Sequence, residues 1–278
     1  MSALTLGISP CPNDTFTFHA LVHGLVPGAP AVEVTYADID VLNGLAADRA
    51  LDIVKVSYGA LPGLLGEYAL LPSGGALGRG CGPLVLTRPE RAGLDLGTAR
   101  LAVPGLRTTA YLLARLWAPA VGEVVVLPFE QIMPAVRAGR VDAGLVIHES
   151  RFTYPSYGLV AEVDLGDWWE RDTGLAIPLG AILARRSLDL DPIGAAVRAS
   201  VEHAWAHPDD PGLAAYLRAH AQEMDPDVQR QHVELYVNGF TADLGTDGYA
   251  AIDGLLTRAA AAGLVEPVAP AALTPTAP

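Results

Sequence analysis

The sequence is short of cysteine, of basic residues and of long apolar runs, and each shortage excludes a class of protein. Two cysteines, Cys11 and Cys81, are too few for a disulfide framework. They lie in separate Gly/Pro-rich loops, so we expect two free thiols rather than a bridge or a metal pair. The sequence therefore predicts neither a disulfide scaffold nor a metal cofactor.

The charge balance is acidic. The chain has 18 Lys and Arg against 31 Asp and Glu, a formal net charge of -13 at pH 7. Such a surface repels phosphate backbones and anionic bilayers, and the basic residues form no block, so neither nucleic acid nor a membrane is an expected partner. No stretch reaches the roughly 18 apolar residues of a membrane span. The N-terminal segment also lacks the basic residues followed by an apolar run that are typical of a signal peptide. A cytoplasmic location is expected.

The residues that are present suit a compact fold. Hydrophobic residues make up 51% of the chain and charged residues 18%, far from the composition of a disordered protein. A length of 278 residues is near the upper limit for one hydrophobic core, so two lobes are expected.

Apolar strand-like runs alternate with helical patterns twice along the chain. Strands separated by helix-length segments indicate βαβ units, a parallel sheet and the α/β class. Residues 73–83 carry five glycines and are predicted to be loop, because glycine forfeits backbone entropy in regular structure. Strands are predicted at 4–9, 32–39, 52–57, 84–88, 100–105, 123–129, 141–148 and 179–186. Three helices are predicted between 192 and 263.

The simplest topology that unites these segments is discontinuous. Residues 1–92 and 181–278 would form a larger lobe, which the C-terminal helices complete, and residues 93–180 a smaller inserted lobe. Ligands of open α/β sheets bind beyond the carboxyl ends of the strands, and clefts between domains are favoured pockets. We therefore expect a small-molecule site between the lobes. The sequence does not indicate an oligomeric state.

The segment after the first strand is expected to form one wall of this cleft. Ser9, Pro10 and Cys11 lie at the strand end. Asn13 and Asp14 follow, and each is more simply interpreted as a cap of the next helix than as a ligand.

Two further strand ends carry polar groups that suit a ligand. Lys55 and Ser57 lie two residues apart and so share one face of a strand. A lysine in an apolar strand is costly unless it reaches a partner, a ligand or solvent, and the sequence leaves these open. Arg107, Thr108 and Thr109 stand at a helix start, where free amides and the helix dipole favour an anion, although threonine there is also an ordinary cap.

The stretch GLVIHESRFTY places His148 at the end of a central strand. Its ordinary pKa of about 6.5 suits proton transfer near neutrality. A lone histidine in such a place is more often structural, and it is the convergence with the other strand ends that favours a general base. Glu149 faces the other way on a strand, while Arg151 and Tyr154 are expected at the cleft rim. The remaining histidines lie in or beside helical patterns, where a surface or hydrogen-bonded role is expected: His19, His23, His203, His207, His220 and His232.

With these residues in view, the chain resembles the 1,4-dihydroxy-6-naphthoate synthase family of the futalosine route to menaquinone. The pairing of HESRFTY with SGGALGRG is highly specific. The matching stretches are SPCPNDTF (9–16), KVSYGAL (55–61), SGGALGRGCGPLV (73–85), VPGLRTTAY (103–111), GLVIHESRFTYPSYGL (144–159), DLGDWWE (164–170) and IPLGAI (177–182).

The resemblance implies a periplasmic-binding-protein-like fold of the second type, used as a cytoplasmic enzyme. It implies that cyclic dehypoxanthinyl futalosine is converted to 1,4-dihydroxy-6-naphthoate and a sugar-derived fragment, and we expect no cofactor. The family's proton acceptor falls on His148. Its substrate contacts fall on Lys55, Val56, Ser57, Thr108 and Thr109.

Three other functions have similar architectures. A solute-binding protein would be expected to carry a signal peptide or a lipidation cysteine, which this sequence does not show. A chorismate dehydratase, the sister enzyme of the same route, is expected to lack the SPCPNDTF and HESRFTY stretches. A transcriptional effector domain would need an attached helix-turn-helix, for which residues 1–15 leave no room.

Overall fold

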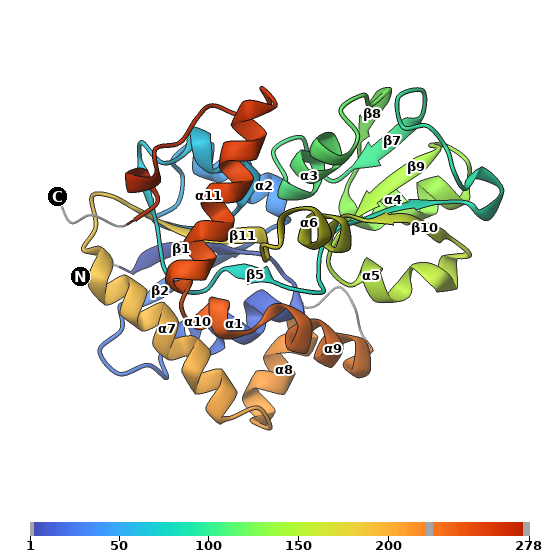
Figure 1. Cartoon of the computed structure of the whole chain (residues 1–278). Helices are drawn as coiled ribbons and strands as arrows, with labels where there is room; N and C mark the ends of the chain where they lie inside the picture. The colour runs from blue at the N-terminus through green and yellow to red at the C-terminus, as the bar shows by residue number, and fades with distance from the viewer. Residues whose placement is uncertain (1–2, 221–224, 275–278) are drawn as a thin grey trace.

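The computed structural model describes residues 3–220 and 225–274, and it has two lobes, each built on its own sheet (Figure 1). Both lobes combine strands with covering helices, so the predicted α/β class and two-lobed architecture are confirmed. Among the described helices, none is long and apolar enough to cross a membrane.

The first sheet has the strand order β2-β1-β3-β11-β4, with β5 also paired to β11. Strand β1 runs parallel to β2 and β3, whereas β11 runs antiparallel to β3, β4 and β5. The sheet is therefore mixed rather than parallel, because β11 returns from the second lobe in the opposite direction. Its strands are β1 (Leu4–Ile8), β2 (Val32–Tyr36), β3 (Ile53–Ser57), β4 (Tyr68–Leu70), β5 (Ala76–Gly78) and β11 (Ile177–Arg185).

The prediction that residues 73–83 are all loop is wrong at β5. Residues 76–78 pair with the first half of β11 despite the surrounding glycines. A long neighbouring strand supplies the backbone partners that the local sequence does not reveal.

The second sheet has the order β10-β6-β9-β7-β8 and places β9 at its centre. Strand β6 pairs antiparallel with β9 and β10, and β9 is parallel to β7. The predicted lobe boundaries differ from this pairing at both ends, because β6 precedes residue 93 and β11 begins before residue 181. The strands are β6 (Leu84–Thr87), β7 (Arg100–Val103), β8 (Glu123–Val126), β9 (Ala143–Val146) and β10 (Val160–Asp164).

Helices cover both sheets. Between residues 190 and 261 there are five described helices rather than the predicted three, and prolines begin two of them, α8 and α9. Those of the first lobe are α1 (Pro12–Val22), α2 (Ile39–Ala47), α7 (Leu190–Ala206), α8 (Pro211–His220), α9 (Pro226–Tyr236), α10 (Gly239–Ala242) and α11 (Gly245–Ala261), with short 3-10 turns η1 (Tyr58–Gly63) and η4 (Pro270–Ala272). Those of the second are α3 (Thr109–Trp117), α4 (Phe129–Arg137), α5 (Ser150–Thr153) and α6 (Leu165–Thr173), with η2 (Pro89–Arg91) and η3 (Tyr154–Tyr157).

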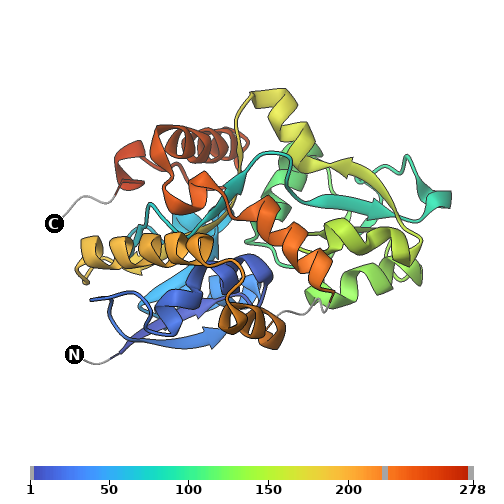
Figure 2. The same ribbon diagram turned by 90° about the horizontal axis from the view of Figure 1, so that it is seen from below.

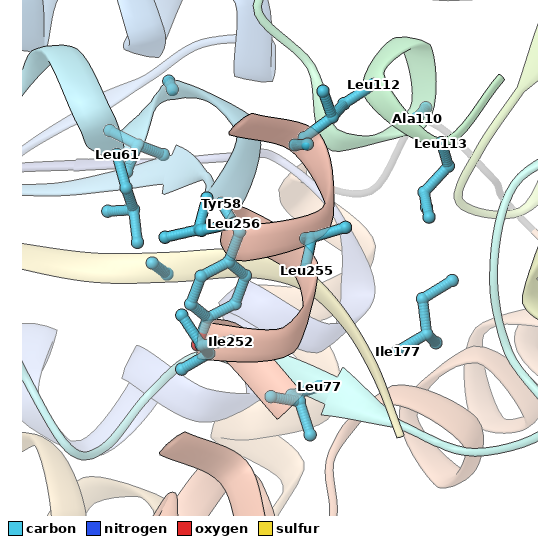
Figure 3. Close-up of a cluster of buried hydrophobic side chains, with 14 of the residues drawn as sticks. Tyr58, Leu61, Leu77, Ala110, Leu112, Leu113, Ile177, Ile252, Leu255 and Leu256 are labelled. Atoms are coloured by element: carbon cyan, nitrogen blue, oxygen red, sulfur yellow. The ribbon is translucent and has the colours of Figure 1, made fainter. Parts of the chain in front are cut away.

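A hydrophobic core joins the two lobes. Side chains of α11, including Ile252 and Leu255, share one buried cluster with Leu77 of β5 and with Leu112 and Leu113 of α3 (Figure 3). Burial of such side chains is worth about 1.5–3 kcal/mol each. Helix α3 of the second lobe is thereby held against the first lobe, and its N-terminus is fixed at the junction.

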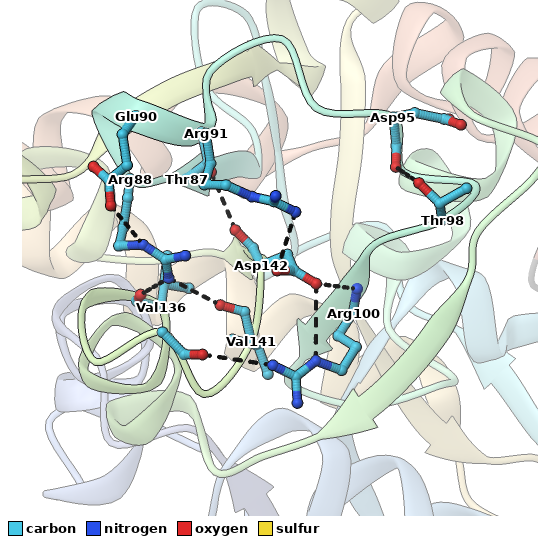
Figure 4. Close-up of polar contacts among 11 residues, drawn as sticks. Thr87, Arg88, Glu90, Arg91, Asp95, Thr98, Arg100, Val136, Val141 and Asp142 are labelled. Carbon is cyan, nitrogen blue, oxygen red and sulfur yellow. Dashed lines mark hydrogen bonds and ion pairs between the residues drawn. The ribbon is translucent and has the colours of Figure 1, made fainter.

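A polar network fixes the start of β9. Asp142, just before this strand, accepts from the amide of Arg100 at 2.9 Å and contacts the guanidinium of Arg91 at 3.2 Å (Figure 4). The guanidinium of Arg88 donates to the carbonyl oxygens of Val136 and Val141 at 2.7 and 3.2 Å. The strand that leads to His148 therefore begins from a fixed point.

Candidate active site

A cavity lies between the lobes, beyond the carboxyl ends of β1, β3, β7 and β9. Its position agrees with the rule that ligands of α/β sheets bind beyond these strand ends. The residues that sequence reasoning placed in the cleft and that line this cavity are Ser9, Cys11, Asn13, Lys55, Ser57, Thr108, Thr109 and His148.

Four predicted site residues do not line the cavity. The side chain of Val56 is buried in the core, on the strand face opposite to Lys55. Pro10 lines a smaller neighbouring hollow. Arg151 forms an ion pair with Asp164, and Tyr154 packs against the hydrophobic core of the second lobe.

The ring of His148 borders the cavity and the hollows beside it. Strand β9 ends at Val146, two residues earlier than the prediction required, and His148 has a left-handed backbone with φ of 51°. This conformation cannot continue an extended strand, and it is uncommon for a residue other than glycine. The ring of Phe129 meets His148 edge to face, with centroids 5.5 Å apart.

Burial lowers the pKa of His148 to about 4, with Lys55 acting in the same direction and Asp14 opposing it. The imidazole is therefore neutral at pH 7 and able to accept a proton.

Lys55 finds its partner in Asp14, which the sequence suggested as a helix cap. Its ammonium bonds Asp14 Oδ1, and both side chains are almost fully buried. The cap position of α1 is instead Cys11, and Asp14 Oδ2 accepts from the amide of Ser9 at 3.1 Å. A Cβ on Gly180 would stand 2.5 Å from Lys55 Cε, so glycine there makes room for the lysine.

Asn43 of α2 orients Ser57, a role that the sequence did not reveal. Its Oδ1 accepts from the amide of Ser57 at 2.8 Å, and its Nδ2 donates to Ser57 Oγ at 3.1 Å. Because Oγ already accepts a hydrogen bond, its own proton is available to an acceptor in the cavity.

The hydroxyls of Thr108 and Thr109 are engaged within the protein. Thr108 Oγ1 donates to the carbonyl of Gly105 at 2.8 Å and caps α3. Thr109 Oγ1 donates to the carbonyl of Leu179 at 2.7 Å and accepts from the amide of Gly59 at 3.1 Å. The amide of Tyr111 already donates to Thr108 Oγ1 at 3.2 Å, so the groups left for an anion at the start of α3 are the amides of Thr109 and Ala110 rather than these hydroxyls.

His232 of α9 is a site residue that sequence reasoning missed. The ring is fully buried and stacks on His148 with centroids 6.1 Å apart and an interplanar angle of 28°. Figure 2 shows α9 extending from the first lobe toward the second. No local pattern could have identified this residue, because the contact depends on how a C-terminal helix lies across the lobe junction.

The described residues include no group of three or more His, Cys, Asp or Glu suited to a metal ion. Cys11 and Cys81 are both free thiols, as predicted. The absence of a cofactor stays a prediction.

Comparison with known proteins points to one family. The family model described as menaquinone biosynthesis matches residues 4–261. A Streptomyces coelicolor protein named 1,4-dihydroxy-6-naphthoate synthase is 63% identical, over 98% of this chain and 99% of that protein. A Thermus thermophilus protein of the same name is 50% identical, over 96% of this chain and 97% of that one.

Solved structures agree with the fold. An Archaeoglobus fulgidus protein aligns with a TM-score of 0.87 at 33% identity, covering 95% of this chain and 98% of that one. A Candida albicans protein, described as having the generic periplasmic binding protein fold, aligns with a TM-score of 0.72 at 13% identity, covering 98% and 94% of the two chains. The architecture is thus that of the periplasmic binding proteins, and with a family match over nearly its whole length the chain belongs to the menaquinone biosynthesis family.

Proposed function

We propose that this protein is a 1,4-dihydroxy-6-naphthoate synthase, a carbon–carbon lyase acting on cyclic dehypoxanthinyl futalosine. The observation that carries the proposal is a neutral imidazole, His148, beside an interlobe cavity that also offers hydrogen-bond donors. The family match and the names of the two relatives support the same reaction. The cytoplasmic location stays a prediction.

The reaction begins with proton removal. His148 takes a proton from the carbon next to the substrate ketone, and the electron pair of that C–H bond forms an enolate. In an elimination, the electron pair of the enolate forms a ring C=C bond while the bond to the sugar-derived portion breaks, and the pair of that bond leaves with this portion, which takes the proton back from the His148 imidazolium. In the alternative retro-aldol step, a hydroxyl of the sugar-derived portion loses its proton and becomes a carbonyl, and the pair of the broken carbon–carbon bond stays on the ring carbon. The remaining bicyclic system becomes aromatic, which provides the driving force. A base already neutral in the free protein starts this sequence without first losing a proton.

The other groups in the cavity bind the substrate and stabilise the enolate. The first-turn amides of α3 suit the substrate carboxylate, because a helix N-terminus favours negative charge. The ammonium of Lys55 and the hydroxyl proton of Ser57 suit the oxygen on which enolate charge develops. A substrate analogue without the carboxylate separates the two assignments. Changes at the α3 end of the cavity should alter the affinity for the substrate but not the affinity for this analogue.

The test is conversion by the purified protein. Incubation with cyclic dehypoxanthinyl futalosine should yield 1,4-dihydroxy-6-naphthoate, detected by mass spectrometry. His148→Asn should lower kcat by about a hundred to ten thousand-fold, the usual contribution of a general base. Its affinity for the product, measured by calorimetry, should change little, because no binding group is removed.

Two alternatives give different outcomes in the same assay. A solute-binding protein would retain the futalosine derivative without turnover, and a chorismate dehydratase would consume chorismate supplied in a parallel reaction. Near-normal turnover by a correctly folded His148→Asn protein would end the assignment of the base.

A further inference from the structure

Among the residues that the structure describes, His148 has no partner of the kind that usually orients a catalytic histidine. Such a base is commonly held by a hydrogen bond from its second ring nitrogen to a carboxylate or carbonyl. Within residues 3–220 and 225–274, no hydrogen bond joins either ring nitrogen of His148 to another protein group. The ring is confined by aromatic neighbours instead, Phe129 at its edge and His232 on its face.

His232 is itself rigidly held. Its Nε2 lies 2.9 Å from Asn13 Oδ1, and its ring packs on Tyr236 one helical turn away, with centroids 4.5 Å apart. Asn13 in turn donates from Nδ2 to Asp14 Oδ1 at 2.9 Å. Asp14 is the ion-pair partner of Lys55, so a continuous chain of contacts links His232 to the predicted substrate groups.

This network fixes the tautomer of His232. Because the amide nitrogen of Asn13 donates to a carboxylate, the amide oxygen faces His232, and Nε2 must carry the proton. The thiol of Cys11 donates to the same oxygen at 3.0 Å. Nδ1 of His232 is buried and has no hydrogen-bond partner among the described residues. Burial, together with His148 and Lys55, keeps the pKa of His232 well below its ordinary value, so the ring stays neutral.

We infer that His232 is a positioning residue: its neutral ring, anchored through Nε2–H to Asn13, is the platform that holds His148 toward the cavity and keeps water from its covered face. The inference rests on the proposed function, in which His148 is the base. A neutral ring also tolerates the positive charge that His148 acquires with the substrate proton, since an aromatic face attracts a cation. A second charged histidine in this place would repel it.

Two variants separate the ring of His232 from its hydrogen bond. His232→Phe keeps a ring against His148 and leaves Asn13 Oδ1 with the thiol of Cys11 as donor. His232→Gln keeps an N–H for Asn13 but removes the ring. We expect His232→Gln to lower kcat by about ten to a hundred-fold through misplacement of the base. KM should change little in both variants, and His232→Phe should retain most of kcat.

The pH profile distinguishes positioning from a purely structural role. With the ring removed, water reaches His148, and the acid limb of kcat/KM should move up toward about 6.5 in His232→Gln but not in His232→Phe. The charged or titratable groups that face His148 or line the same cavity and hollows are unchanged in both variants: Asp14, Lys55, Cys11, Asp38, Asp40, Glu149 and Tyr236. Thermal unfolding of each variant controls for stability.

Several outcomes would overturn the inference. One is a folded His232→Gln protein with the kcat and acid limb of the unsubstituted protein. Another needs no variant: nitrogen-15 spectra of histidine-labelled protein should show His232 as the Nε2–H tautomer, and the Nδ1–H tautomer would contradict the network. His148→Asn, assayed in parallel, keeps the two proposals distinguishable. If it is inactive while both His232 variants behave normally, only the positioning role fails.

Discussion

At the scale of single residues, the strength of His148 as a base is set by its surroundings. A pKa of about 4 in the free protein keeps the ring neutral at pH 7 but makes it a weak proton acceptor. A bound substrate changes this balance, because its carboxylate and the developing enolate both favour the protonated ring. The base should therefore become stronger once the cavity is occupied.

This difference predicts two separate acid limbs. The limb of kcat/KM reports the free protein and should lie near the pKa of about 4, whereas the limb of kcat reports the complex and should lie higher. Initial rates between about pH 3.5 and 8, with circular dichroism to confirm folding at each pH, measure both limbs. A kcat/KM limb at the ordinary histidine pKa would contradict the burial of His148.

The buried ion pair between Lys55 and Asp14 gives a second prediction at this scale. Lys55→Met leaves a carboxylate uncompensated in the core and should lower the free energy of unfolding by about 3–5 kcal/mol. The double variant Lys55→Met, Asp14→Asn removes the charge and should recover most of the loss. Urea unfolding of the three proteins is the measurement, and equal losses in the single and double variants would contradict the pairing.

At the scale of elements, the start of α3 is the joint between the lobes. Thr109 connects the carbonyl of Leu179 in β11 to the amide of Gly59 in η1 through one hydroxyl. A close contact lies beside it, because a Cβ on Gly105 would come within 2.0 Å of Asp40 Oδ1 on α2. The amides that are proposed to bind the carboxylate are thus fixed relative to both sheets.

Replacement of Thr109 tests this joint. Thr109→Val leaves two backbone groups without their partner and should lower the free energy of unfolding by about 1–3 kcal/mol. Thr109→Ser keeps the hydroxyl and should lie close to the original protein. Urea unfolding compares the two. An equally stable Thr109→Val protein would show that the hydroxyl does not hold the lobes together.

At the scale of the whole molecule, several histidines couple stability to pH. Folding lowers the pKa of His148, His232, His19 and His220, in each case chiefly through burial. The unfolded chain therefore binds protons below about pH 6.5 that the folded protein does not bind until lower pH. Stability is present above that pH and is lost as pH falls.

We expect the midpoint of thermal unfolding to decrease steadily from pH 7 to pH 5 at constant ionic strength. The carboxylates contribute mainly below this window, which leaves the histidines as the main cause. His232→Phe removes one of these groups, so its midpoint should fall less over the same range. A midpoint that is flat from pH 7 to 5 in the original protein would be incompatible with neutral, buried histidines.

The sequence by itself determined the α/β class, the two lobes and much of the candidate site. Strand alternation placed Lys55 and Ser57 on one face, and the apolar run before His148 placed that residue at the end of a central strand, although β9 ends two residues earlier. Val56, which the resemblance implied as a substrate contact, is buried on the opposite face. These features follow from local periodicity and from where strands end, both of which a single sequence carries.

Tertiary structure alone decided which groups become partners. The bond between Asn13 and His232 spans 219 residues, and that between Asn43 and Ser57 joins a helix to the next strand. Pairing between segments far apart in the sequence also explains the mixed sheet and strand β5, because its partner β11 comes about a hundred residues later. A local pattern indicates which face of an element is buried, but it does not specify the distant segment that packs there.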